Sequence, residues 1–114
     1  MAAPPIDLLQ GSLDVIVLKT LSWQPMHGFG IARWIQQLSD DALPIEEGTL
    51  YPALYRLENR GFVKAEWRIT ENKRRAKYYR LTAAGRRQLT EHTERWEAFA
   101  SVMSRILRTA TQPA

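Results

Sequence analysis

The sequence predicts a single small domain that is mainly α-helical and carries one β-hairpin, an α+β fold. Three observations predict it: a length of 114 residues, apolar residues at helical spacing in several segments, and a change to a two-residue period after Gly61. Apolar residues make up 45% of the chain and charged residues 25%, as in ordinary globular proteins. A domain of this length can bury a core without disulfides or metal.

Two helices are predicted before residue 40. Ser12 can cap the first, which stays apolar through Leu21 until Pro25 stops it. The second begins at about His27 or Gly28 and ends at Leu38. Its predicted buried face consists of Phe29, Ile31, Ala32, Ile35 and Leu38.

A third helix is predicted from Glu47 to Arg60, ended by Gly61. Leucines at i, i+4 and i+7 place one stripe of this helix against the core. Pro52 is expected within about the first turn, where its missing N–H costs little. The stripe consists of Leu50, Leu54 and Leu57, and the opposite face presents Thr49, Pro52, Tyr55, Arg56 and Asn59.

An antiparallel hairpin is predicted after Gly61. Apolar residues alternate with polar ones over 63–70, which is typical of a strand buried on one side. The polar stretch 71–75 is followed by a second extended run from Lys77 to Leu81. Of Tyr78 and Tyr79, one is expected in the core and the other within reach of a phosphate. The alternating apolar residues are Val63, Ala65, Trp67 and Ile69.

A long last helix is predicted, capped by Thr82 and running to about Arg108. Leu89, Trp96 and Met103 are spaced by seven residues, which indicates an a/d seam over nearly three heptads. At about 1.5 Å per residue the helix is about 40 Å long. The seam therefore favours packing on a partner subunit, with folding back on the chain's own core as the alternative.

Positive charge is concentrated in the hairpin. Residues 64–80 contain seven cations and two glutamates, a net charge of +5, whereas the whole chain carries +4. Such a concentration favours a polyanionic partner, and a solvated charged loop is the alternative.

Three short helices, a hairpin with a basic tip and a closing helix together predict a winged helix-turn-helix. In this fold the third helix enters the major groove, and the hairpin, called the wing, reaches phosphates or the minor groove. The groove is about 12 Å wide and admits a helix with small or hydrogen-bonding side chains. The expected DNA-binding residues are Thr49, Tyr51, Pro52, Tyr55, Arg56 and Asn59 on the third helix, His27 and Gly28 at the start of the second, and Lys73, Arg74, Arg75 and Lys77 on the wing.

The run Gly48-Thr49-Leu50-Tyr51-Pro52-Ala53-Leu54-Tyr55-Arg56-Leu57-Glu58, followed by Gly61-Phe62-Val63, resembles the third helix of PadR-family transcriptional regulators. Arg74-Arg75-Ala76-Lys77-Tyr78-Tyr79-Arg80-Leu81-Thr82-Ala83-Ala84-Gly85 is similar to that family's wing and the opening of its last helix. His27-Gly28-Phe29-Gly30-Ile31 is similar to its second-helix start. The resemblance extends from Leu8 to about Leu107. It implies a homodimeric bacterial regulator, usually a repressor, often released from its operator by a small molecule.

The single closing helix resembles the compact branch of that family. In multidrug-binding members of this branch, a tryptophan on the last helix lines a pore at the dimer interface and stacks on flat ligands. Trp96 falls at the matching position, which implies a planar aromatic effector, with plain dimer packing as the alternative. Lys19 and Ala100 depart from the neutral and acidic side chains of the drug-binding version. The residues that this resemblance and the seam assign to the interface or pore are Val15, Lys19, Leu89, Trp96, Phe99, Met103 and Ile106.

Other functions are disfavoured. Absence of cysteine excludes disulfides and thiolate sites, His27 and His92 lack a metal-ligand pattern, and no nucleophile–base arrangement appears, so no metal, cofactor or enzyme activity is expected. No apolar run is long enough for a signal or a membrane span, which predicts a cytoplasmic protein. The expected organisation is a winged helix-turn-helix over residues 6–82 and a dimerisation helix over 83–108. The competing function is an interaction module whose basic wing binds acidic protein or RNA.

Overall fold

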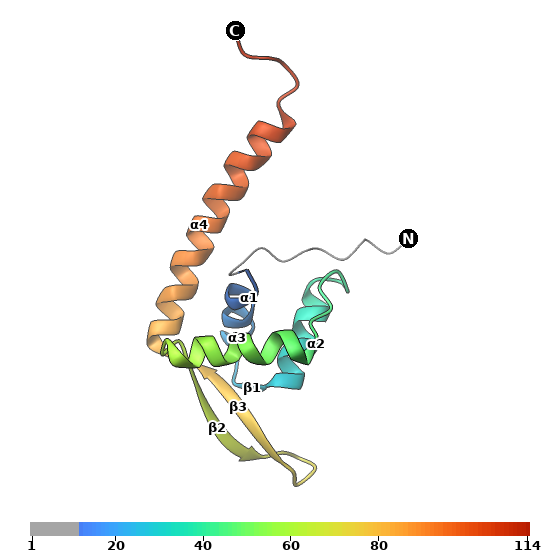
Figure 1. The fold of residues 1–114 in the computed structure, drawn as a ribbon, viewed down its shortest axis with the longest axis vertical. Helices are drawn as coiled ribbons and strands as arrows, with labels where there is room; N and C mark the ends of the chain where they lie inside the picture. The colour runs from blue at the N-terminus through green and yellow to red at the C-terminus, as the bar shows by residue number, and fades with distance from the viewer. Residues whose placement is uncertain (1–11) are drawn as a thin grey trace.

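The protein folds into four helices and a three-stranded antiparallel sheet in a computed structural model that describes residues 12–114. The predicted α+β fold class is confirmed. Residues 6–11, with which the predicted first domain begins, lie outside the described residues. In chain order the elements are α1 (Ser12–Leu21), β1 (Met26–His27), α2 (Gly28–Leu38), α3 (Glu47–Asn59), β2 (Val63–Ile69), β3 (Arg75–Leu81) and α4 (Ala83–Arg108), as Figure 1 shows.

The core lies where α1, α2 and α3 pack together over the base of the sheet. The predicted leucine stripe of α3 is buried there. Tyr79 is the member of the tyrosine pair that packs in the core, and Leu89 of α4 packs against its edge. The core consists of Leu13, Val17, Leu18, Leu21, Met26, Ile31, Ile35, Leu50, Ala53, Leu54, Leu57, Val63, Tyr79 and Leu81.

The first two helices differ in detail from the prediction. Helix α1 is described from Ser12, the first residue that the structure describes, and ends at Leu21, where the Ser22 N–H donates to the Lys19 carbonyl over 3.0 Å. Pro25 therefore does not stop this helix.

The predicted buried face of α2 is wrong at both ends. Phe29 and Leu38 are exposed, whereas Ile31 and Ile35 are buried. Phe29 is two residues from Ile31, about 200° around the helix, so it points away from the core. Leu38 is the last residue of the helix and lies past the last buried side chain.

The sheet has the order β1-β3-β2, so β3 is central. The sequence does not predict β1, because a two-residue strand is too short to show alternation. Met26 of β1 pairs with Tyr79 of β3, and His27 pairs with Tyr78. This short strand joins the start of α2 to the wing, and the wing is formed by β2, β3 and the turn between them.

The wing projects beyond the helices, as Figure 1 shows. Val63 pairs with Leu81 at its base, and Ile69 pairs with Arg75 near its tip. The one-sided burial predicted for β2 holds only near the base, because Trp67 is exposed and Ile69 is 75% exposed. The outer half of the strand has no core to face.

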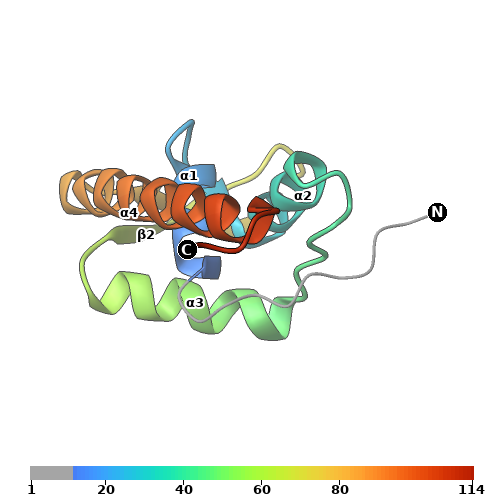
Figure 2. The same cartoon turned by 90° about the horizontal axis from the view of Figure 1, so that it is seen from above.

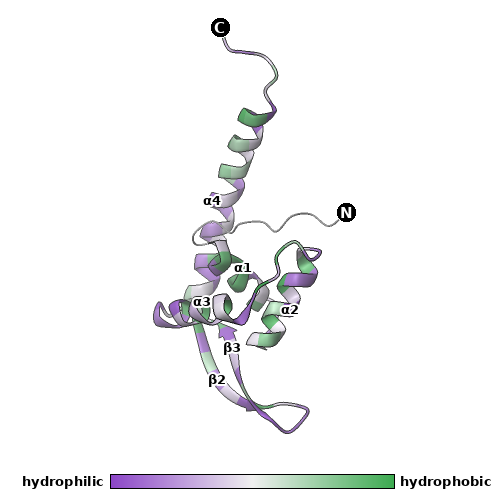
Figure 3. Cartoon of the chain, turned by 45° about the vertical axis from the view of Figure 1, so that its right-hand side comes forward, coloured by the Kyte–Doolittle hydropathy of each residue, from purple (hydrophilic) through white to green (hydrophobic). Residues whose placement is uncertain are grey.

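Helix α4 also projects from the body of the molecule. With this helix included, the molecule spans 66 × 37 × 21 Å. Thr82 caps it as predicted, accepting a hydrogen bond from the Gly85 N–H over 3.0 Å and donating to the Gly61 carbonyl over 2.7 Å. Its projecting half carries exposed apolar residues, and Figure 3 colours much of it as hydrophobic. None of the helices in residues 12–114 combines the length and apolar character of a membrane span.

Candidate nucleic-acid interface

Helix α3 runs along one edge of the molecule, as Figure 2 shows, with one side open to solvent. Directly opposite the leucine stripe lie four exposed residues that we call the outer face of α3: Gly48, Pro52, Tyr55 and Asn59. The Tyr55 side chain is 66% exposed. None of the four is charged, and together they form a shallow helical surface with a phenol and an amide as hydrogen-bonding groups.

Pro52 lies deeper in α3 than predicted. It is the sixth residue of a helix that begins at Glu47, so it stands in the second turn rather than the first. Its ring leaves the Gly48 carbonyl without the amide donor that position 52 would otherwise supply. Both residues are exposed, so water can reach that carbonyl.

Arg56 does not extend freely from α3. Its guanidinium donates to the Asp14 carboxylate of α1 over 2.9 Å. Thr49 lies on the same flank of α3, toward α1, by helical geometry. The predicted DNA-facing set is therefore divided between the outer face and this flank.

Tyr51 lies on the opposite flank, toward the wing, and packs over Gly28 at the start of α2. A Cβ at Gly28 would lie 2.7 Å from the Tyr51 hydroxyl. Two residues predicted to bind DNA are thus in contact with each other. Gly28 is buried beneath the ring, whereas the Tyr51 side chain is exposed to solvent.

His27 caps α2, and its Nδ1 accepts a hydrogen bond from the Gly30 N–H over 2.9 Å. The ring packs edge-on against Tyr78 of the wing, with ring centroids 5.3 Å apart. His27 therefore lies at the start of the second helix, as predicted. His92 is distant from it on α4, at the junction with α1 and α3.

The four predicted wing cations differ in how they are held. The Arg75 guanidinium stacks on Trp67 at 4.7 Å, and Lys77 lies 3.9 Å from the Glu58 carboxylate of α3. Lys73 occupies the turn with a φ of 58°, and Arg74 follows it. Within residues 12–114, neither Lys73 nor Arg74 takes part in an ion pair.

A concave surface of about 770 Å³ lies between the wing and the start of α2. It joins wing cations to Tyr51, His27 and Gly28 across segments far apart in the sequence. The prediction misses Phe29 and Trp67 as members of this surface, because apolar residues at regular spacing indicate core burial. Its lining residues are His27, Gly28, Phe29, Tyr51, Trp67, Thr70, Asn72, Arg74, Arg75, Ala76, Lys77 and Tyr79.

Tyr79 is a buried residue in the lining of this surface. Burial raises the pKa of its phenol above the ordinary value of 10.0, and the neighbouring Glu58 and Tyr51 raise it further. The tyrosine is therefore neutral at physiological pH and contributes no negative charge that would repel a polyanion.

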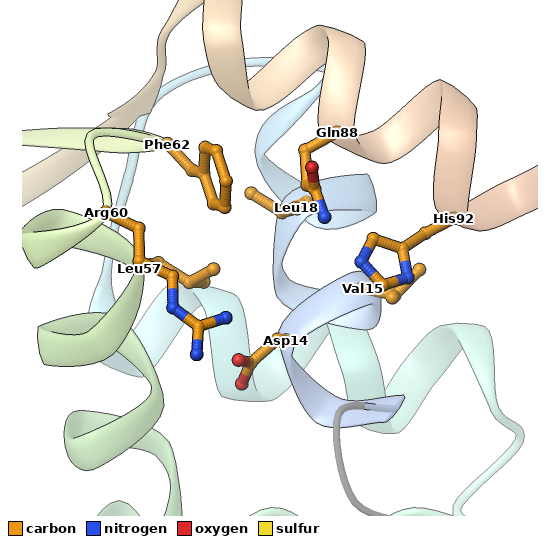
Figure 4. Close-up of a pocket in the computed structure, with 8 residues that line it drawn as sticks. All are labelled: Asp14, Val15, Leu18, Leu57, Arg60, Phe62, Gln88 and His92. Atoms are coloured by element: carbon orange, nitrogen blue, oxygen red, sulfur yellow. The ribbon is translucent and has the colours of Figure 1, made fainter.

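The residues predicted for an interface or pore are not gathered in one place within a single chain. Leu89 packs against the core, and Val15 lines a hollow of about 50 Å³ between α1, α3 and α4, shown in Figure 4. Lys19 lies 4.6 Å above the Trp23 ring. The other four lie exposed on the projecting part of α4: Trp96, Phe99, Met103 and Ile106.

Four helices, a wing with unpaired cations and an exposed third helix define a winged helix-turn-helix protein. A family model described as the transcriptional regulator PadR-like family matches residues 17–91. The chain belongs to this family. It is therefore a DNA-binding regulator of transcription and not an enzyme.

Two relatives and two solved structures are similar to this chain. An uncharacterised protein of Lysinibacillus sphaericus is 30% identical over 90 residues, which are 79% of this chain and 83% of that protein. The transcriptional regulator Rv3488 of Mycobacterium tuberculosis is 41% identical over 68 residues, 59% of this chain and 63% of that protein. A transcriptional regulator of Clostridium thermocellum has a similar structure, with a TM-score of 0.79 and 32% identity over 87% of this chain and 96% of that one. A PadR-family transcriptional regulator of Eggerthella lenta also has a similar structure, with a TM-score of 0.73 and 35% identity. The match covers 88% of this chain and 85% of that one.

Proposed function

We propose that this chain is a cytoplasmic repressor that binds a palindromic operator as a homodimer. Residues 6–82 form the DNA-binding domain and residues 83–108 the dimerisation helix. The observation that carries the proposal is the exposed, uncharged outer face of α3 beside a wing with unpaired cations. A groove-sized neutral surface next to a source of positive charge suits base contacts flanked by phosphate contacts.

The two surfaces take different roles. Tyr55 and Asn59 contact base edges, with Thr49, Tyr51 and Pro52 against the groove wall. Lys73 and Arg74, joined by Arg75 and Lys77, contact phosphates, and His27 with Gly28 places the start of α2 near the backbone. Because a dimer carries two such heads, the operator contains two half-sites about one helical turn apart or slightly more.

A mobility-shift experiment with the promoter DNA flanking the protein's own gene tests this function. We expect a shifted complex that unlabelled flanking DNA competes away and random duplex does not. Tyr55→Ala is expected to cost about 1–3 kcal/mol on that fragment and little on random duplex. Addition of the protein to a cell-free transcription reaction from that promoter should lower the transcript.

Equal binding to flanking and random DNA would remove sequence-specific reading from the proposal. Tighter binding to RNA or to an acidic protein through the wing would favour the competing function of an interaction module. The uncharged outer face of α3 favours DNA over RNA or an acidic protein. If the wing bound a polyanion by charge alone, this exposed face of the third helix would have no role.

A planar aromatic ligand is a further part of the proposal, with Trp96 as its platform. The Trp96 side chain is 54% exposed, and its ring lies 6.1 Å from that of Phe99. Stacking on the indole would contribute about 0.5–1.5 kcal/mol beyond area burial. A ligand between two such helices would change the spacing of the DNA-binding heads and release the operator.

Fluorescence titration with planar dyes tests the ligand site. We expect dyes to quench the wild type more than Trp96→Ala and to weaken operator binding by the wild type alone. Equal quenching of both would leave Trp96 with a packing role only.

A further inference from the structure

The Asp14–Arg56 ion pair connects α1 to the DNA-facing helix. It joins the first turn of α1 to the last turn of α3, with 2.9 Å between the Asp14 Oδ1 and an Arg56 guanidinium nitrogen. The Asp14 side chain is only 15% exposed, whereas that of Arg56 is 48% exposed. The carboxylate is therefore the fixed partner, and the arginine is the one that solvent and ligands can reach.

Arg56 lies one turn after Pro52, so its side chain leaves α3 at the border of the outer face. An arginine at this position, if unpaired, would reach toward any polyanion that covers that face. On the opposite flank Glu58 lies 3.9 Å from Lys77. Ion pairs thus occupy both flanks of α3, and the surface between them carries no charge.

A free arginine beside the outer face would add affinity for every DNA sequence. Phosphate contacts carry no sequence information, so such a contact would raise operator affinity and non-specific affinity alike. A carboxylate that holds the guanidinium lowers this sequence-independent part of the affinity and leaves base contacts by Tyr55 and Asn59 unchanged.

We propose that Asp14 is a positioning residue: it holds Arg56 away from DNA phosphates and so lowers the sequence-independent affinity of α3 for DNA. The proposal rests on the proposed function, in which α3 enters the major groove. It assigns a role in DNA recognition to a residue on α1 that lies outside the helix-turn-helix face itself.

The test measures the salt dependence of binding to a random duplex for wild type and Asp14→Asn. Loss of the carboxylate charge should release Arg56 to a phosphate, so the slope of log affinity against log salt steepens by about 0.9 per protomer. A fourfold rise in salt then costs the variant about 3.5-fold more affinity than the wild type for each protomer on the duplex, or about twelvefold when both heads of a homodimer bind. Affinity for the flanking promoter fragment should rise by a similar factor, because a phosphate contact carries no sequence information.

Asp40→Asn is the matched control, because it makes the same chemical change on an exposed residue in the turn after α2. Asparagine tolerates the left-handed backbone of that position, where φ is 52°. This control should keep the wild-type slope. Asp14→Glu, which retains a carboxylate for Arg56, should also restore a slope near that of the wild type.

The double variant Asp14→Asn/Arg56→Gln separates released charge from altered folding. Arg60 points into the same hollow as Asp14, as Figure 4 shows, and is unchanged in this variant. If Arg56 is the released group, the double variant loses the steeper slope. A steeper slope that persists without Arg56, or an Asp14→Asn slope equal to that of Asp40→Asn, would overturn the proposal. Absence of DNA binding by the wild type would instead refute the proposed function on which it rests.

Discussion

Gly28 and Gly85 are both places where the chain approaches too closely for a side chain, but the neighbouring group differs. At Gly85, at the start of α4, a Cβ would collide with the Phe62 backbone carbonyl and with Leu81. At Gly28 it would meet only the end of the Tyr51 ring. The backbone carbonyl cannot move without shifting the end of α3 relative to the sheet, whereas an exposed ring can rotate.

Gly85→Ala should therefore destabilise the protein by about 1–3 kcal/mol, as expected for overpacking. Gly28→Ala should cost about 1 kcal/mol or less, because rotation of Tyr51 relieves the clash and alanine favours the helix. Urea unfolding followed by circular dichroism measures both. A larger loss for Gly28→Ala than for Gly85→Ala would contradict the assignment of the rigid contact to Gly85.

The buried phenol of Tyr79 should make stability fall at alkaline pH. Its folded-state pKa is raised above 10.0, whereas the unfolded chain ionises near that value. The unfolded state therefore loses the proton first, so stability that is fully present below pH 10 is lost as the pH rises through the folded pKa. Tyr79→Phe should show a weaker decline above pH 10 than Tyr55→Phe, whose phenol is exposed; equal declines would show that burial of Tyr79 is not the cause.

At the scale of elements, periodicity predicts what repeats and misses what depends on distant contacts. The leucine stripe of α3 and the capping of α4 by Thr82 follow from local pattern, and the structure confirms both. The strand β1 has no period to detect. The Asp14–Arg56 pair joins residues 42 positions apart, so no local pattern indicates it. Exposure of Ile69 follows from the length of the wing beyond the core, which strand alternation cannot reveal.

The wing should supply sequence-independent affinity, and its cations should not contribute equally. Arg74→Ala removes a cation without an ion pair in the described part of the chain, so the salt slope on random duplex should fall by about 0.9 per protomer. Lys77→Ala should lower it by less, because Lys77 already lies 3.9 Å from Glu58. Both variants should keep the preference for operator over random DNA; a wing variant that changed this preference while Tyr55→Ala did not would reverse the assigned roles.

The whole molecule is elongated because α4 projects from the body without a covering layer, as Figure 1 shows. Its outer half exposes Trp96, Phe99, Val102, Met103, Ile106 and Leu107. At about 100° per residue these side chains share one side of the helix. A contiguous apolar stripe of this kind is typical of an interaction surface, and in the proposed homodimer a second copy would supply a matching stripe by two-fold symmetry.

Met103→Asp should therefore shift the proposed homodimer toward monomer, because it places a charge in the middle of that stripe, where burial without a partner is costly. Ser101→Asp is the matched control, since position 101 lies about 160° around the helix from position 103 and is also exposed. Sedimentation velocity should show dimer for the wild type and for Ser101→Asp, and monomer for Met103→Asp at the same concentration. A monomer has one DNA-binding head and can bind only one half-site. The monomeric variant should therefore lose most of its affinity for the palindromic operator, and it should retain weak binding to random duplex. A wild type that sediments as a monomer at about tens of micromolar, far above the concentrations at which specific operators are bound, would refute the dimer and with it the two-site operator.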